Sequence, residues 1–355
     1  MPDLVSNALH NKAKRQVANW LLLGVVMIVI QILLGGITRL TESGLSITEW
    51  KPITGILPPL NEAAWQVEFD KYKGTDQFRQ VHAHFSLAEF KFIFFWEWFH
   101  RLFARLMGMV FLVGFIYFLV TGKLKREMVR PMTILFLLGA LQGAVGWLMV
   151  KSGLVPEMYY VGHVELATHL LMALLLLAYT LWFALKLKVD GQPVNNTSLR
   201  RLLVFIVAIL FLQLIYGGFM AGMRAAVMAP TWPDINGYLV PAGIKSLSPA
   251  VLNFFNNAIT IHFIHRGLAY LLFFLVVLGW FKSRKIQGNT FFSRVWLLTL
   301  LLIITQVILG ILTVLNAVYA GRLLWFGVAH QFVAILLVIS ITCLLFITRR
   351  QVPHD

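Results

Sequence analysis

Four histidines lie in long apolar segments of this chain, in two pairs of matching neighbourhoods. His100 stands in FHRLFARLMG and His265 in IHRGLAYLLF, 165 residues later. His169 stands in ATHLLMALLLL and His330 in AHQFVAILLVI, 161 residues later. An ionisable side chain is costly inside a membrane and usually has a function there.

Neutral imidazole is an axial ligand of haem iron, so the pattern predicts two metal–porphyrin sites. We pair His100 with His169 and His265 with His330, one from each of two facing helices. A helix–helix hydrogen bond is the alternative for any single intramembrane histidine. Zinc fits less well, because the carboxylate and cysteine ligands that it often takes are scarce here.

Glu97 makes the two expected sites unequal. It precedes His100 by three residues, on the same side of a helix, and the matching position in the second half is His262. A carboxylate beside one site alone would give that site proton chemistry. The alternative is an interfacial Glu97 that pairs with Arg101 or reaches water. His262 could contact a porphyrin edge, but we expect it to face the outer interface.

Other polar residues near the histidines have weaker roles. Arginine makes bidentate contacts with carboxylates, so four arginines are candidate partners for haem propionates, with ordinary interfacial anchoring as the alternative for each: Arg39, Arg101, Arg224 and Arg266. His82 and His84 lie in a polar loop, and we expect both to be solvated.

The elements that must position these residues are membrane spans. The chain is 59% hydrophobic and 13% charged, against about 25% charged in soluble domains. Its apolar segments are long enough to cross a bilayer as helices. They number eight: about 17–37, 92–121, 131–150, 160–185, 202–222, 258–281, 296–315 and 324–347.

The net charge of +15 is a topology signal. Basic residues gather before the first span, in alternate connections and after the last span: Lys12, Lys14, Arg15, Lys123, Lys125, Arg126, Arg130, Lys186, Lys188, Arg200, Arg201, Lys282, Arg284, Lys285, Arg294, Arg349 and Arg350. By the positive-inside rule both termini are cytoplasmic. This placement argues against a nucleic-acid partner.

Depth places both sites near the far side of the membrane. His169 and His265 each precede the first basic residue at the cytoplasmic end by 17 residues, about 26 Å of helix. We see no cleaved signal or organelle transit segment, so we expect a bacterial inner membrane with haem sites near the periplasm. The single cysteine, Cys343, excludes a disulfide within the chain.

An internal repeat relates the two halves. Gln31–Gly36 reads QILLGG and Gln213–Gly218 reads QLIYGG, while Leu141–Gly146 reads LQGAVG and Thr305–Gly310 reads TQVILG. Small residues recur in membrane helices for packing alone, but the shared order indicates duplication. We therefore predict an all-α integral membrane protein. Its eight transmembrane helices would form two tandem four-helix bundles, 1–190 and 191–355, related by a pseudo-twofold axis along the membrane normal.

These residues resemble the haem A synthase family along essentially the whole chain. The stretch GGITRLTESGLSITEWKPITGILPP at Gly35–Pro59 is its most specific feature. Shorter matches are EWFHR at Glu97–Arg101, TWP at Thr231–Pro233, IHR at Ile264–Arg266 and AHQ at Ala329–Gln331. The outer-loop cysteine pair of some members is missing, which puts a thiol role in electron supply in doubt.

The resemblance implies an oxidoreductase that converts the C8 methyl of haem O to the formyl of haem A, for cytochrome oxidase. It places substrate haem between His100 and His169, beside Glu97 as the carboxylate of the oxidation. It places a resident haem b between His265 and His330. Haem O synthase and cytochrome oxidase assembly factors are the implied partners, besides membrane lipid, and glycine-lined surfaces leave homo-oligomerisation open. A two-haem b-type electron-transfer cytochrome without substrate chemistry is the alternative; a transporter fits less well because intramembrane charges are few.

Overall fold

The computed structural model describes residues 2–50, 54–189, 193–286 and 289–349, and these residues fold into helices and connecting loops. Eight helices in this described part are long and apolar enough to cross a membrane, as predicted. They are α1 (Pro2–Leu40), α3 (Leu87–Val120), α4 (Arg126–Gly153), α5 (His163–Lys188), α6 (Thr197–Gly222), α9 (Ala258–Ser283), α10 (Thr290–Leu315) and α11 (Ala320–Ile347).

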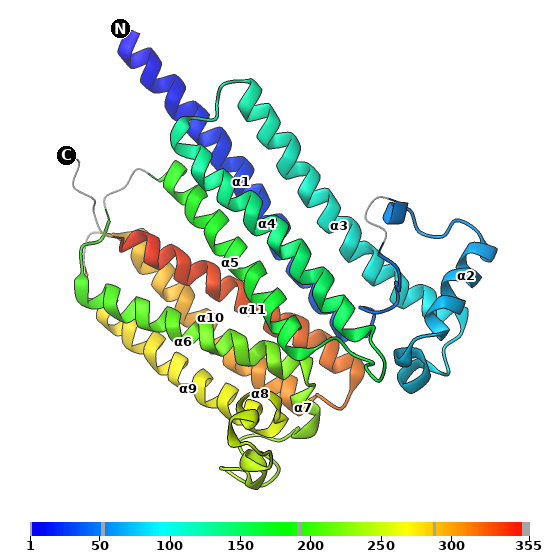
Figure 1. Cartoon of the computed structure of the whole chain (residues 1–355). Coiled ribbons are helices and arrows are strands. Elements are labelled where there is room, and N and C mark those ends of the chain that lie inside the picture. The colour runs from blue at the N-terminus through cyan, green and yellow to red at the C-terminus, as the bar shows by residue number, and fades with distance from the viewer. Residues whose placement is uncertain (1, 51–53, 190–192, 287–288, 350–355) are drawn as a thin grey trace.

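Shorter helices gather at one end of the membrane helices (Figure 1). We call this the cap end; the beginning of α1 and the end of α11 lie at the opposite, terminal end (Figure 1). The short helices are η1 (Thr54–Ile56), α2 (Glu62–Lys73), the π-helix η2 (Phe78–His82), α7 (Ala225–Met228), η3 (Ala242–Lys245), η4 (Ala250–Leu252) and α8 (Asn253–Asn256).

Polar caps set where several of these helices begin. Ser86 forms a capping box with Glu89 at the start of α3, which satisfies two otherwise unpaired backbone groups. Asn196, Asn257 and Asn289 accept backbone N–H bonds at the starts of α6, α9 and α10. Asn and Ser are preferred at this position because their side-chain oxygen reaches the free N–H groups of the first turn.

The core lies where the two halves of the chain meet. Helix α1 packs on α3, α5 and α11, while α6 packs on α5, α9 and α11. In the most apolar window of α5 and of α11, 50% of the residues are buried, against 6% in α3 and in α4. The halves therefore share one hydrophobic core, with α5 and α11 at its centre. The predicted boundary at residue 190 falls outside the described residues and stays a prediction.

Equivalent residues of the two repeats touch each other at the cap end. Arg39 donates to the carbonyl of Ala221, and Arg224 pairs with Glu42; each contact joins positions 182 residues apart. The same offset relates Gln31 to Gln213 in the repeat. Residues related by a twofold axis meet only close to that axis, so contacts at this offset are those that the predicted pseudo-axis would require; the axis itself stays a prediction.

An aromatic cluster holds α2 against α3 at the cap end of the first half. Phe69 and Tyr72 of α2 are buried with Phe90, Ile93 and Phe94 of α3. Their rings stack, with Phe69 and Phe90 centroids 5.0 Å apart. This cluster fixes the loop after α1 above Glu97.

Candidate functional site

The four predicted histidines come from four different membrane helices, in the part of each nearer the cap end. His100 lies on α3 and His169 on α5; His265 lies on α9 and His330 on α11. Within each half, the two histidines lie on separate helices at a similar depth, as the expected pairing requires, and ligation of one iron by each pair stays a prediction.

Each imidazole lies against a glycine of a neighbouring helix. A Cβ atom added to the glycine would come within 2.7–3.3 Å of the ring, closer than ordinary van der Waals contact. The pairs are Gly35 with His100, Gly146 with His169, Gly217 with His265, and Gly310 with His330. These four glycines are therefore needed to let the rings occupy the space between helices.

Two of the imidazole rings have a nitrogen without a hydrogen-bond partner, which fits metal–porphyrin binding. The Nδ1 atoms of His265 and His330 are buried and have no hydrogen-bond partner. A buried polar atom without a partner is costly, and a metal ion is one way to satisfy a ring nitrogen. In the described part of the chain, no three His, Cys, Asp or Glu side chains cluster around one point. The two histidines of each half are therefore the candidate ligands of a porphyrin iron, which can take one or two imidazoles.

Glu97 is buried and fully engaged beside His100. Only 2% of its surface is exposed. Its Oε2 accepts hydrogen bonds from the Ser46 hydroxyl at 2.7 Å and the Ile47 N–H at 2.8 Å. Its Oε1 accepts from Nη2 of Arg101 at 2.6 Å. The pairing with Arg101 that the sequence left open is present, and the bonds from Ser46 and Ile47 tie the loop after α1 to α3.

The matching position in the second half has the same construction with different chemistry. His262 is fully buried, and its Nε2 accepts from Nε of Arg266 at 3.0 Å. Arg266 also donates to the carbonyl groups of Thr231, Pro233 and Asp234. Arg101 likewise donates to the carbonyl groups of Ile47 and Glu49. The expectation that His262 faces the outer interface was wrong, because the loop after α6 covers it.

The four candidate arginines all lie near the cap end, and each already has a protein partner. Arg101 and Arg266 clamp loop carbonyls, Arg39 donates to Ala221, and Arg224 binds Glu42 and the Tyr160 hydroxyl. Their positions suit propionates at this end, but loop anchoring already accounts for the contacts of Arg101 and Arg266.

His82 is buried in a polar network, so the expectation that it is solvated was wrong. Its Nδ1 lies 2.6 Å from the Tyr72 hydroxyl, which donates to Oε1 of Gln77, and its Nε2 lies 3.0 Å from the Glu42 carboxylate. Burial lowers the pKa of His82, and burial also raises the pKa of Tyr72. His84 is exposed, as expected. No sequence signal predicts this network, because Glu42, Tyr72 and His82 come from three separate segments: the loop after α1, α2 and η2.

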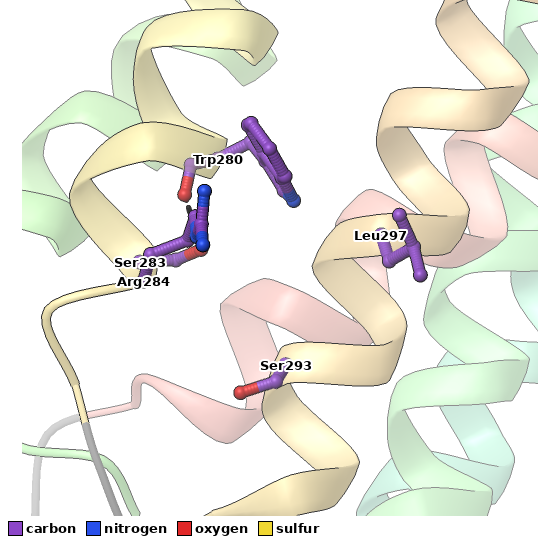
Figure 2. A pocket seen from close by; sticks show the side chains of 5 residues that line it. All are labelled: Trp280, Ser283, Arg284, Ser293 and Leu297. Carbon is purple, nitrogen blue, oxygen red and sulfur yellow. Dashed lines mark hydrogen bonds between the residues drawn. The ribbon is translucent and has the colours of Figure 1, made fainter.

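A separate cavity of about 410 Å³ opens between α9 and α10 at the terminal end. Figure 2 shows Trp280 and Ser283 of α9, and Arg284 directly after it, opposite Ser293 and Leu297 of α10. Trp280 follows His265 by four helical turns, so this cavity is remote from the histidine pairs.

These features define the class of protein: a multi-pass helical membrane protein with two half-buried histidine pairs. Residues 18–342 match the model of the COX15-CtaA family, described as cytochrome oxidase assembly protein. The chain belongs to this family.

Three similar proteins from different bacteria carry the name "Heme A synthase". A protein named "Heme A synthase" from Bradyrhizobium diazoefficiens is 44% identical over 90% of this chain and 88% of its own length. A "Heme A synthase" from Parvibaculum lavamentivorans is 43% identical over 87% of this chain and 91% of its own length. One from Flavobacterium psychrophilum is 39% identical over 93% of this chain and 97% of its own length.

Proposed function

We propose that this chain is a haem A synthase, an oxidoreductase that converts the C8 methyl group of haem O to the formyl group of haem A. Full-length similarity to relatives of that name is the observation that carries the proposal. The unequal pair Glu97 and His262 supports an enzyme over a symmetric electron carrier, because it makes one of two equivalent positions acidic.

The first half would hold the substrate. His100 and His169 would bind its iron, and the glycines opposite them leave room for the rings. Oxidation of a methyl carbon removes electrons and protons, so a proton acceptor is needed. Glu97 is that acceptor in this proposal, with Ser46, Ile47 and Arg101 fixing its two oxygens.

The second half would hold a resident b-type haem between His265 and His330, which supplies one-electron redox chemistry when bound. The protein's own contribution there is to orient the two imidazoles and to exclude water. Arg266 holds the covering loop over His262 through three carbonyl groups. The positive charge of this arginine is not offset by a carboxylate at the His262 position.

The proposed location is a bacterial inner membrane, with both termini cytoplasmic and the histidine pairs near the periplasmic side. Basic residues at the terminal end support this orientation, among them Lys12 and Lys14 before the span of α1 and Lys186 and Lys188 at the end of α5. Haem O synthase and cytochrome oxidase assembly factors are the proposed partners, since one would deliver the substrate and the others would use the product.

The test is to supply haem O to cells that express the protein and to analyse the extracted pigment. We expect formyl haem from the unaltered protein and little or none from Glu97→Ala. Unmodified haem b alone, with haem O supplied, would overturn the enzyme in favour of an electron carrier. A reduced-minus-oxidised spectrum without haem would overturn both.

A further inference from the structure

A glutamine stands four residues before each glycine that faces a histidine. Residues four apart lie on the same side of a helix, so each glutamine is directed toward the same imidazole as its glycine. The pairs are Gln31 and Gly35 on α1, Gln142 and Gly146 on α4, Gln213 and Gly217 on α6, and Gln306 and Gly310 on α10. One Gln-x-x-x-Gly motif therefore occurs at all four histidines.

Three of the four side-chain amides contact their imidazole directly. The distances from the amide nitrogen are 3.2 Å for Gln142 to Nδ1 of His169, 3.4 Å for Gln213 to Nε2 of His265, and 3.2 Å for Gln306 to Nε2 of His330. At His265 and His330 the other ring nitrogen has no protein partner. Each of these two rings thus has one nitrogen at an amide and one that is free.

The amide oxygens of the four glutamines lack a hydrogen-bond donor. Oε1 of Gln31, Gln142, Gln213 and Gln306 is buried in every case and has no hydrogen-bond donor. Helix N–H groups cannot serve, because those in the helix interior bond to carbonyl groups four residues earlier. An imidazole that binds iron through one nitrogen carries its proton on the other and donates it to an acceptor. A half turn of the amide about its last torsion presents Oε1 to that N–H.

We propose that Gln213 and Gln306 are positioning residues, whose amide oxygens accept the N–H of the iron-binding imidazoles. Each fixes the tautomer and the ring plane of its histidine and makes it a stronger ligand. The inference rests on the histidine pairs binding haem, as proposed above, but not on the oxidation of haem O.

The two glutamines of the first half differ from those of the second. The Gln31 amide donates to the backbone carbonyl of His100 at 3.2 Å and does not contact the ring. The Gln142 amide, besides its ring contact, donates to the backbone carbonyl of His169 at 3.1 Å, so a half turn would break that bond. In the second pair each ring is thus held by an amide that can turn, whereas neither ring of the first pair is. A haem that stays bound suits the second pair, and a haem that is bound, changed and released suits the first pair.

Gln306→Leu in the haem-loaded protein removes the acceptor while keeping similar volume. We expect haem affinity at the second pair, measured by titrating stripped protein with haem, to fall about 10- to 100-fold. We also expect the reduction potential of that haem to rise, because an imidazole without an acceptor gives less electron density to iron. Gln306→Glu supplies an acceptor again, so its affinity should recover and its potential should lie at or below the original value.

Gln331→Leu is the matched control. Gln331 follows His330 directly, and its amide bonds the Ile32 carbonyl of α1 at 2.8 Å. Its loss removes an interhelical hydrogen bond without removing a partner of the ring, so the potential should not change. Gln213→Leu repeats the test at His265 if Gln306→Leu fails to fold.

Unchanged affinity and potential in both leucine variants would overturn the inference while leaving haem binding intact. Equal loss of haem in Gln306→Leu and Gln306→Glu would also overturn it, because packing alone would then explain the glutamine. Protein that binds no haem before any substitution would overturn the proposed function itself.

Discussion

In each half of the chain an arginine next to a histidine holds the covering loop through its carbonyl groups, an arrangement that we call the arginine clamp. The two clamps differ in the side chain that the arginine binds. In the first half Arg101 holds the covering loop and pairs with the carboxylate of Glu97; in the second half Arg266 holds its loop and pairs with the imidazole of His262. The carboxylate of the first clamp lies on α3 itself, whereas in the second clamp the nearby carboxylate, Asp234, belongs to the covering loop. The two clamps thus share one construction but place an acid beside only one histidine, which separates proton chemistry from electron storage in the proposed enzyme.

The halves also differ in how their outer helices pack. In the described part of the chain α9 packs against α10, whereas their counterparts α3 and α4 pack on α1 and α5 and not extensively on each other. In the most apolar window of α9, 28% of the residues are buried, against 6% for α3. A more open first half suits a site that exchanges its haem.

Removal of an axial histidine gives the largest expected effect and tests the assignment of the halves. His265→Ala should abolish the b-type spectrum of the purified protein and, with it, haem A production. His100→Ala should abolish haem A production and retain the b-type spectrum. Reduced-minus-oxidised spectra measure the b-type haem, and pigment extraction measures haem A. Loss of the b-type haem in both variants would contradict the assignment of one resident and one substrate site.

Exchange of the charged positions tests the difference between the clamps. Glu97→Gln should lower haem A formation by about 10²–10⁴-fold, the contribution of a positioned acid–base group, with the b-type spectrum unchanged. His262→Gln should lower haem A formation by less than about tenfold, because no acid–base group is lost from the substrate site. Similar losses in single-turnover assays of the two variants would mean that Glu97 acts only as a loop anchor.

Filling the glycine sites tests how tightly each half holds its ring. A Cβ at Gly146 would lie 2.7 Å from Cε1 of His169, and one at Gly310 would lie 3.1 Å from Cε1 of His330. Gly146→Ala should therefore cost more, about 1–3 kcal/mol in free energy of unfolding.

Gly143→Ala is the control on the same helix, since an added Cβ there meets nothing within 4 Å. It should be neutral or stabilising by up to about 1 kcal/mol. Thermal unfolding in detergent measures all three variants, and a Gly143→Ala loss as large as that of Gly146→Ala would argue against a role for the ring.

The smallest expected effect concerns pH and the cap of the first half. Burial lowers the pKa of His82 below its ordinary 6.5, although Glu42 lies 3.0 Å from its Nε2. Below about pH 6.5 the folded protein therefore binds fewer protons at His82 than the unfolded chain does. The free energy of unfolding is highest above about pH 6.5, and it decreases as the pH falls from there toward the lowered pKa of His82. The unfolding temperature should decrease on acidification, and less steeply in His82→Gln. Identical slopes for the two proteins would show that His82 does not cause the decrease.

The sequence alone determined the spans, the histidine pairs and the unequal position of Glu97. Spans could be predicted because apolar length is a local property, and the pairs could be predicted because duplication repeats residues at a nearly constant offset. The glutamines were visible in the same repeat, but nothing in their spacing along the chain shows which atoms lack a partner.

Tertiary structure decided the contacts made between distant segments. His82 lies in a polar loop by sequence, and only the packing of α2 on α3 buries it against Tyr72 and Glu42. His262 is covered by the loop after α6, whose carbonyl groups accept hydrogen bonds from Arg266 although the loop lies more than 30 residues earlier in the chain. Burial of a loop residue depends on segments that are far apart in sequence, whereas insertion of an apolar helix depends on its own residues.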